Sequence, residues 1–381
     1  MNKSLIIVAG GTAGHIYPAV GLIEFIKIKY PDIKIGFIGT QSGMEKNLIK
    51  GMDIEFWQIR ASGFSMTSGI IKKIDVYCRF LFNLVLGFFK ALKIIKSFKP
   101  FVILGMGGYI CAPVFIAAKI CRKKIAIHEQ NFIPGRLNKF FSKFSSLIFV
   151  SFKDSIELFK KINKNKSAEI IYSGNPLRQK VLNFYKIDAD YNLFSLEKDR
   201  KTIVAFGGSL GAQKINKTVV TLYDYFRNEE KLQFLLISGE RFYESLVYNL
   251  KENFSASDKL IFKIYPFIYD MEKIYRIADL IIARAGATTI AELDYTRTPA
   301  ILIPYPQAIE NHQYYNALYL VGKNIAFIIN DSELTVENLL KGIKKLSDID
   351  SLNVRINNFK KGVYVNFNSS QIMTEKILAN I

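Results

Sequence analysis

The segment Leu280–Leu293 carries residues whose chemistry is readily interpreted. An apolar run leads into a turn that contains Gly286, and a helix-like pattern then begins with Thr288 and Thr289. The first N–H groups of such a helix lack partners within the helix and carry partial positive charge, which suits a phosphate group. Glu292 follows about one turn later, where its carboxylate would accept hydrogen bonds from sugar hydroxyls. The pattern predicts an anion site, although it also fits an ordinary strand–turn–helix connection.

A second glycine-rich segment, GGTAGHIYP at residues 10–18, follows the first apolar run. Its glycines let the backbone approach a ligand closely, and His15 would lie at the start of the next helix. A neutral imidazole there can take a proton from an attacking hydroxyl near pH 7, or it can simply cap or pack. The segment lacks the G-x-G-x-x-G pattern, and Gly39-Thr40 ends the second strand where a dinucleotide-binding fold has an acidic residue. Both features disfavour an oxidoreductase.

Two further polar clusters also come directly after apolar runs. They are Gly105-Met106-Gly107-Gly108-Tyr109 and His128-Glu129-Gln130-Asn131. Open α/β sheets place their ligand-binding groups at the carboxyl ends of strands. We therefore expect both clusters to lie near His15, around one crevice.

The elements that must position these residues are continuous apolar runs alternating with helical stretches. Runs without polar alternation are typical of parallel strands covered on both faces. Their alternation with helices predicts an α/β fold with doubly wound parallel sheets. The expected strands are Leu5–Ala9, Lys34–Ile38, Ile54–Ile59, Phe101–Leu104, Lys124–His128, Leu147–Val150, Ile170–Tyr172, Thr202–Phe206, Gln233–Ile237, Leu260–Ile264, Leu280–Ala283, Ala300–Ile303 and Ala326–Ile329.

The chain repeats this plan once. GGTAGH follows the first strand, and GGSLGA at residues 207–212 follows the strand Thr202–Phe206. This repeat predicts two Rossmann-like domains that face a ligand-binding cleft. We expect the first domain at residues 1–173 and the second at residues 174–355. A helical tail at residues 356–381 is expected to pack back on the first domain.

Composition limits the possible environments. The chain has 381 residues, of which 50% are apolar, so it can form two sizeable cores and is not a disordered chain. A formal charge of +19 favours an acidic partner such as a phosphorylated substrate, an anionic membrane surface or a nucleic acid. Three cysteines without metal-like pairing favour a reducing compartment. The apolar run Leu5–Ala9 is too short for the core of a signal peptide.

The stretch Ile74–Ile95 has more apolar surface than a single core contact requires. Asp75, Arg79, Asn83, Lys90 and Lys93 lie near one helical line, and apolar side chains cover most of the rest. Charges in this number disfavour a membrane-spanning helix. We expect one face in the core and another at a membrane interface, with a fully buried helix as the alternative.

Seven motifs in order along the chain resemble those of the MurG family of glycosyltransferases. They run from Gly10 to Ala317 and are GGTAGHIYP, GMGGY, HEQN, GNPLR, GGSLGA, ARAGATTIAE and ENHQYYNA. The resemblance implies a two-domain GT-B fold and inverting transfer of GlcNAc from UDP-GlcNAc. The implied acceptor is the MurNAc 4-hydroxyl of undecaprenyl-pyrophosphoryl-MurNAc-pentapeptide, so that lipid I becomes lipid II. Ala13 stands where the family usually has a third glycine.

The same resemblance implies roles for individual residues. Glu292 would bind the ribose hydroxyls of the donor, the backbone around Ile268 the uracil, and Ser209 the diphosphate. His15 would act as the general base on the acceptor side, with Glu129 as its rival, and Tyr109, Gly107 and Gly108 beside them. The donor-binding set as a whole would be Thr12, Ala13, Gly14, Asn131, Arg178, Ser209, Ile268, Ala287, Thr288, Thr289, Ile290, Ala291, Glu292 and Gln313.

The resemblance also implies partners and a location. Expected partners are UDP-GlcNAc, lipid I, an anionic membrane surface contacted through Ile74–Ile95, and other proteins of cell-wall synthesis, and the expected processes are peptidoglycan synthesis, cell shape and cell division. The expected location is peripheral, on the cytoplasmic face of the membrane. No cofactor and no metal is expected, because Asp188 and Asp190 resemble a metal-binding D-x-D but lie in a polar linker away from the glycine loops.

Two other classes of function stay open. Another GT-B enzyme, such as a diacylglycerol glycosyltransferase or a UDP-GlcNAc 2-epimerase, would share the fold, but GMGGY and HEQN favour the lipid II-forming family. A basic nucleic-acid-binding protein is suggested by charge alone, and the sequence has no basic recognition helix or aromatic sheet motif to support it.

Overall fold

The computed structural model describes residues 3–41, 45–63, 70–163, 168–253, 255, 257–347 and 368–380. It forms two compact units, Met1–Gln179 with Asn368–Ile381, and Lys180–Phe367. The first unit extends a few residues past the boundary expected at 174. The reason is that the backbone of Leu177 and Arg178 packs so closely on Gly21 that a Cβ there would clash. The expected end of the second domain at residue 355 lies outside the described residues.

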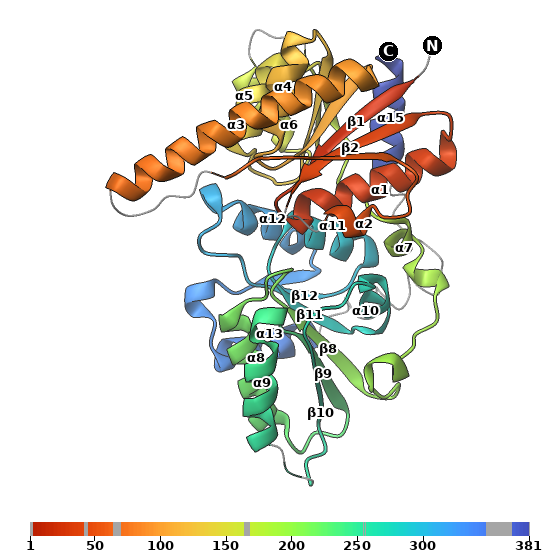
Figure 1. Ribbon diagram of the computed structural model, residues 1–381. Coiled ribbons are helices and arrows are strands. Elements are labelled where there is room, and N and C mark those ends of the chain that lie inside the picture. The colour runs from red at the N-terminus through yellow and green to blue at the C-terminus, as the bar shows by residue number, and fades with distance from the viewer. Residues whose placement is uncertain are drawn as a thin grey trace. The chain divides into compact units, whose positions relative to one another are not determined.

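The first unit contains a seven-stranded parallel sheet in the order β3-β2-β1-β4-β5-β6-β7 (Figure 1). Apolar side chains on both faces are buried, as the continuous apolar runs predicted. The strands are β1 (Ser4–Ala9), β2 (Lys34–Thr40), β3 (Glu55–Ile59), β4 (Val102–Gly107), β5 (Lys124–Glu129), β6 (Leu147–Val150) and β7 (Glu169–Tyr172).

Helices cover the two faces of this sheet with separate cores. On one face, α1 (Ala13–Lys29) packs with α15 (Ser369–Ala379), and Met373 and Ile377 of α15 are buried in that core. On the other face lie α3 (Ile70–Phe98), α4 (Cys111–Ile120) and α5 (Arg136–Phe141). The remaining helices of the unit are α2 (Glu45–Leu48), α6 (Ser155–Ile162) and the 3₁₀ turn η1 (Ser142–Phe144).

The second unit contains a six-stranded parallel sheet in the order β10-β9-β8-β11-β12-β13. Its strands are β8 (Lys201–Phe206), β9 (Leu232–Ile237), β10 (Ile261–Tyr265), β11 (Leu280–Ala283), β12 (Ala300–Leu302) and β13 (Ala326–Ile328). The helices that follow them are α8 (Gln213–Phe226), α9 (Glu240–Asn253), α10 (Met271–Ile277), α11 (Ala287–Thr296), α12 (His312–Val321) and α13 (Val336–Ser347). Every strand expected from the sequence is present, and the predicted fold class is confirmed.

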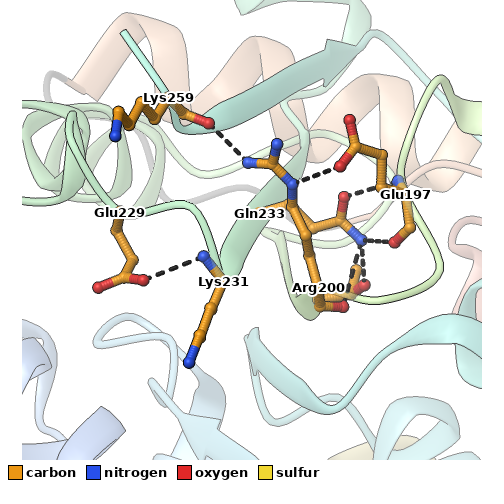
Figure 2. A network of polar contacts seen from close by, with 7 residues as sticks. Glu197, Arg200, Glu229, Lys231, Gln233 and Lys259 are labelled. Atoms are coloured by element: carbon orange, nitrogen blue, oxygen red, sulfur yellow. Dashed lines mark hydrogen bonds and ion pairs between the residues drawn. The ribbon is translucent and has the colours of Figure 1, made fainter.

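The polar linker that enters the second unit folds without strands, as its composition indicated. After α7 (Gln179–Leu182) it forms the short turns η2 (Phe184–Lys186) and η3 (Asn192–Phe194). The fully buried amide of Gln233, in β9, then holds the end of the linker by hydrogen bonds (Figure 2). This amide donates to the carbonyl oxygen of Glu197 at 2.7 Å and to the Thr202 hydroxyl at 2.8 Å, and it accepts from the Glu197 N–H at 2.9 Å.

Helix α3 is buried only toward its C-terminal end. Ala91, Ile94 and Ile95 lie in the core, and Gly87 touches the Arg60 carbonyl so closely that a side chain there would clash. The N-terminal part of α3 extends beyond the sheet (Figure 1), and Phe82, Val85 and Phe89 are 59%, 50% and 61% exposed. The expected core contact and the exposed apolar side chains are both present, and the alternative of a fully buried helix is wrong. The membrane interface stays a prediction. In the described part of the chain, no helix is long and apolar enough to span a bilayer.

Candidate functional site

The first group of candidate residues lies where the sheet of the first unit changes direction. Strands β1 and β4 are neighbours, and the chain continues from β1 toward one edge of the sheet and from β4 toward the other. Ligands of open α/β folds bind at the carboxyl ends of the strands at such a switch point. The loop carrying Thr12 follows β1, Gly108 and Tyr109 follow β4, and Gln130 follows β5.

Glycines allow these loops to touch one another. Gly107 and Gly108 have φ angles of +111° and +88°, which disfavour residues with a side chain. A Cβ on Gly107 would lie 2.5 Å from Nδ1 of His15, and one on Gly108 would lie 2.3 Å from the carbonyl oxygen of Gly10. The two glycines predicted beside the acceptor thus make room for the histidine and for the first glycine loop.

His15 is the third residue of α1 and lies in its first turn. The N-cap residue of this helix, Thr12, makes no side-chain hydrogen bond to the first turn. The exposed Thr12 and the partly exposed Ala13, Gly14 and His15 form the entry of the helix. The imidazole Nδ1 lies 3.2 Å from Oε1 of Gln130. The structure therefore brings together the histidine loop and the HEQN segment, as the sequence predicted.

His128 is completely buried beneath this surface. Its Nε2 lies 3.0 Å from the carbonyl oxygen of Gly174, and its Nδ1 lies 3.0 Å from Nε2 of Gln130. Burial lowers the pKa of His128 from 6.5 to about 4, the hydrogen bond to Gly174 opposes this change, and the nearby His15 adds to it. His128 is therefore neutral near pH 7.

Glu129 holds the HEQN segment in place. One carboxylate oxygen accepts from the backbone N–H of Asn131 at 3.0 Å, and the other accepts from the N–H of Gly135 at 2.9 Å and from the Asn138 amide at 2.8 Å. The side chain is almost fully buried. These bonds engage both oxygens of Glu129 in the loop and in the start of α5.

Tyr109 and Arg178 are positioned by contacts within the same unit. Tyr109 is 45% exposed, and its ring lies against Gly63, where a Cβ would be 2.7 Å away. The guanidinium of Arg178 lies over the ring of Tyr17, 4.4 Å from its centroid. Tyr17 belongs to α1 two residues after His15, so Arg178 is held near the histidine turn.

The second group of candidates lies at the corresponding switch point of the other sheet, between β8 and β11. The GGSLGA loop turns sharply after β8, with Gly208 and Gly211 at φ angles of +86° and +73° and the Gly211 N–H bonded to the Gly208 carbonyl at 3.0 Å. Ser209 is exposed at the tip of this turn. A Cβ on Gly211 would lie 2.1 Å from the carbonyl oxygen of Ser238, so only glycine fits there.

Helix α11 begins beside this loop without a side-chain cap. Its N-cap is Gly286, and the first turn is formed by Ala287, Thr288 and Thr289 and followed by Ile290 and Ala291. Glu292 is 5% exposed, and its Oε2 accepts a hydrogen bond from the hydroxyl of the fully buried Tyr275 at 2.6 Å. The carboxylate is thus fixed from one side in the second turn of a helix whose N-terminus suits an anion.

Two further expected donor residues, Ile268 and Gln313, lie at the same edge of this sheet, whereas Thr12, Ala13, Gly14, Asn131 and Arg178 belong to the first unit. Ile268 follows β10 and is partly exposed. Gln313 is in the first turn of α12, and its Oε1 accepts from the backbone N–H of Tyr305 at 2.9 Å. Asn316 of the same helix donates to the carbonyl oxygen of Ala285 at 3.2 Å, which ties α12 to the start of α11.

One member of the acidic pair in the linker makes a local contact. Oδ1 of Asp190 accepts from the backbone N–H of Leu193 in η3 at 3.1 Å. Among the residues that the structure describes, no three His, Cys, Asp or Glu side chains are grouped so that they could hold a metal ion.

Comparison with known proteins identifies the family of the chain. The model of the glycosyltransferase family 28 N-terminal domain matches residues 5–150, and that of the C-terminal domain matches residues 202–362. The UDP-N-acetylglucosamine–N-acetylmuramyl-(pentapeptide) pyrophosphoryl-undecaprenol N-acetylglucosamine transferase of Desulforamulus reducens is 38% identical over 345 residues, which cover 90% of this chain and 89% of that protein. The protein of the same name from Bacillus subtilis is 34% identical over 340 residues, 89% of each. The chain belongs to glycosyltransferase family 28, and within it to the MurG family.

Solved structures place the fold of this MurG family member among known glycosyltransferases. The crystal structure of Acinetobacter baumannii MurG matches with a TM-score of 0.69 and 25% identity over 99% of both chains. A UDP-GlcNAc 2-epimerase from Neisseria meningitidis, solved with UDP-GlcNAc bound, matches with a TM-score of 0.65 at 12% identity over 99% of this chain and all of that one. At that identity the second likeness shows the fold alone.

Three side chains received no role of their own from the sequence. Gln130 was expected near His15 as part of the HEQN cluster, but its contact with both His15 and His128 could not be predicted from that motif, which contains one histidine. Tyr17 belongs to GHIYP in the same way. Tyr275 lies on a different helix from Glu292, and no sequence pattern indicates their contact.

The buried His128 should make the stability of the protein depend on pH. In the unfolded chain this histidine ionises near pH 6.5, whereas in the folded chain it stays neutral down to about pH 4. Between these values the unfolded state binds more protons, so the free energy of unfolding falls as the pH falls, by up to about 3 kcal/mol. Urea unfolding at several pH values should show a shallower dependence for His128→Gln. Equal slopes for wild type and His128→Gln would contradict the prediction.

Proposed function

We propose that the chain transfers GlcNAc from UDP-GlcNAc to the MurNAc 4-hydroxyl of lipid I and so forms lipid II. The named relatives carry this activity in their descriptions and match about 90% of the chain. The observation that carries the proposal is the placement of His15 at the switch point of the first sheet, in contact with the HEQN segment. An imidazole at a ligand-binding edge suits removal of a proton from a sugar hydroxyl.

The second unit would bind the donor. The uncapped N-terminus of α11 offers backbone N–H groups to the diphosphate, and the Ser209 turn lies after the neighbouring strand β8. These groups favour the negative charge that develops on departing UDP, which lowers the barrier for leaving. Glu292, held by Tyr275, would accept hydrogen bonds from the ribose hydroxyls.

The reaction needs one proton acceptor on the acceptor side. The 4-hydroxyl oxygen of MurNAc forms a bond to C1 of GlcNAc, the bond from C1 to the UDP oxygen breaks with inversion, and the hydroxyl proton moves to the base. The two oxygens of Glu129 already accept hydrogen bonds from Asn131, Gly135 and Asn138. We therefore assign the base to His15 and a structural role to Glu129.

The acceptor is carried by a lipid, and the exposed helices of the first unit suit a membrane surface. Outward apolar side chains on α3, α4, α5 and η1 include Leu81, Phe82, Val85, Leu86, Phe89, Ile116, Ile120, Phe140 and Phe144. Lys119 lies over the ring of Phe144, 5.4 Å from its centroid, and Lys90, Lys93 and Lys143 are exposed on the same elements. Apolar side chains among lysines are typical of helices that rest in an anionic interface. The enzyme would then work peripherally, on the cytoplasmic face of the membrane.

The proposed activity is tested by incubating the protein with UDP-GlcNAc and a short-chain lipid I analogue. We expect UDP release that requires the analogue, and His15→Ala should lower kcat by roughly 10²–10⁴-fold, the usual cost of losing a general base. Excess EDTA should leave the rate unchanged, and a loss restored by Mg²⁺ would instead implicate Asp188 and Asp190. Conversion of UDP-GlcNAc without acceptor would indicate an epimerase and overturn the proposal.

Donor binding is tested at Glu292. Glu292→Ala removes a carboxylate that we assign to two ribose hydroxyls, and the loss of about 3 kcal/mol should raise the KM for UDP-GlcNAc roughly a hundredfold. Tyr275→Phe should raise it less, because the carboxylate remains but is no longer held from behind. Glu244→Ala, at an exposed position on α9, serves as the control. An unchanged KM in a folded Glu292→Ala protein would remove this assignment.

Membrane binding is tested on α3. Replacing Phe82, Val85 and Phe89 by Ser should weaken binding to anionic vesicles at least about tenfold, because these exposed side chains would lose their apolar contact with lipid. A matched variant with Leu193, Tyr225 and Tyr248 replaced by Ser changes equally exposed apolar residues of the second unit and should bind as wild type. Equal affinity of both variants in vesicle co-sedimentation would refute the membrane surface on α3.

A further inference from the structure

A buried chain of hydrogen bonds connects His15 to the interior of the first unit through Gln130 and His128. Gln130 is 2% exposed and follows β5, whereas His15 follows β1 and Met106 belongs to the intervening strand β4. The side-chain amide of Gln130 contacts the carbonyl oxygen of Met106, Nδ1 of His128 and Nδ1 of His15. One neutral amide therefore links both histidines of this unit.

The surroundings fix which way the Gln130 amide points. The Met106 carbonyl oxygen can only accept a hydrogen bond, so the atom of Gln130 that faces it must be the nitrogen Nε2. The oxygen Oε1 then faces His15, 3.2 Å from Nδ1. Because a carbonyl oxygen can only accept, the hydrogen of a neutral His15 must lie on Nδ1, and the lone pair lies on Nε2.

The hydrogen bonds of His128 independently give the same orientation of the Gln130 amide. The carbonyl oxygen of Gly174 lies 3.0 Å from Nε2 of His128, so this nitrogen carries the hydrogen, with the Ser151 hydroxyl 3.3 Å away. Nδ1 of His128 must then accept, and the second hydrogen of Gln130 Nε2 points to it at 3.0 Å. The buried His128 stays neutral near pH 7, so this direction of donation does not reverse there. The backbone carbonyls of Met106 and Gly174 thus set the orientation of the Gln130 amide and of the His128 ring.

We infer that Gln130 and His128 are positioning residues that hold His15 in the tautomer with hydrogen on Nδ1 and so present the Nε2 lone pair as the base. This inference rests on the proposed glycosyl transfer. A histidine side chain in water favours hydrogen on Nε2, which would place a hydrogen where the acceptor proton must arrive. The neutral amide of Gln130 selects the productive tautomer without adding a charge to the site. Because Gly107 has no side chain, the His15 imidazole has room to contact this amide.

The tautomers can be observed directly, because the chain has only three histidines. In protein labelled with ¹⁵N-histidine, two-bond ¹H–¹⁵N correlation spectra distinguish hydrogen on Nδ1 from hydrogen on Nε2. We expect His15 with hydrogen on Nδ1 and His128 with hydrogen on Nε2, with assignments from His15→Gln and His312→Gln. Gln130→Met removes the acceptor, so His15 should move toward the Nε2–H form. Hydrogen on Nε2 of His15 in the wild type would overturn the inference.

Kinetics provide the second readout. Gln130→Met should lower kcat by about 10–100-fold, the usual cost of losing a residue that orients a functional imidazole, while the KM for UDP-GlcNAc changes less than about twofold. Gln130→Glu still offers an oxygen to His15 Nδ1–H, so it should retain the tautomer. Its second oxygen would face the Met106 carbonyl oxygen and His128 Nδ1, which can only accept, so we expect a less stable protein and a lower kcat as well. Gln233→Met removes an equally buried and hydrogen-bonded amide that belongs to β9 of the other unit, and it should leave both readouts unchanged.

The outcomes separate this inference from the proposed function. A wild-type protein that releases no UDP with the lipid I analogue would overturn the proposed function, whereas the spectra need no substrate and still report the tautomer. An active wild type whose Gln130→Met variant keeps its kcat would overturn the positioning role alone. If Gln130→Met does not fold, the wild-type spectrum and the Gln130→Glu variant still decide the question.

Discussion

Parallel strand pairing is the constraint on which both candidate sites depend. When all strands of a sheet run in one direction, all of their carboxyl ends meet at one edge, and residues far apart in sequence become neighbours there. In the first unit this brings together segments after β1, β4 and β5. In the second it brings together segments after β8, β10, β11 and β12. Right-handed crossovers of helix then cover the faces and leave this edge for ligands.

At that edge, the need to satisfy buried polar groups determines the detailed geometry. Gln130, His128 and Glu129 are almost completely buried, so each must find hydrogen-bond partners inside the protein. Glu129 accepts hydrogen bonds from the loop and from the start of α5. Gln130 and His128 form a hydrogen bond with each other and with two backbone carbonyl oxygens. This second set of hydrogen bonds reaches the partly exposed His15 through Gln130. The requirement that stabilises the interior would therefore also orient the imidazole that we propose as the base.

The sequence predicted the strands and the fold class because continuous apolar runs have few alternatives in a chain of this size. It also placed the glycine loops, the HEQN segment and the start of α11 at strand ends. It could not show that Glu129 is fully engaged by Asn138, or that Tyr275 supports Glu292, because these contacts join separate elements whose packing no local pattern encodes. For α3, periodicity predicted two apolar faces, but only packing against the sheet shows that Ile94 is inside and Phe89 outside.

Fold likeness alone does not separate a transferase from an epimerase, since the Neisseria meningitidis epimerase shares the two-unit architecture at 12% identity. The uncapped start of α11 and the paired Glu292 suit any UDP-sugar enzyme, because they address the nucleotide and the diphosphate. The features that we propose for the acceptor lie in the first unit: His15 with its proposed tautomer, the glycines that make room for it, and α3 with its exposed apolar side chains. An enzyme that only rearranges its own nucleotide sugar has no need of the membrane surface that we propose on α3. The argument for transfer to a lipid-linked sugar therefore depends on the first unit more than on the second.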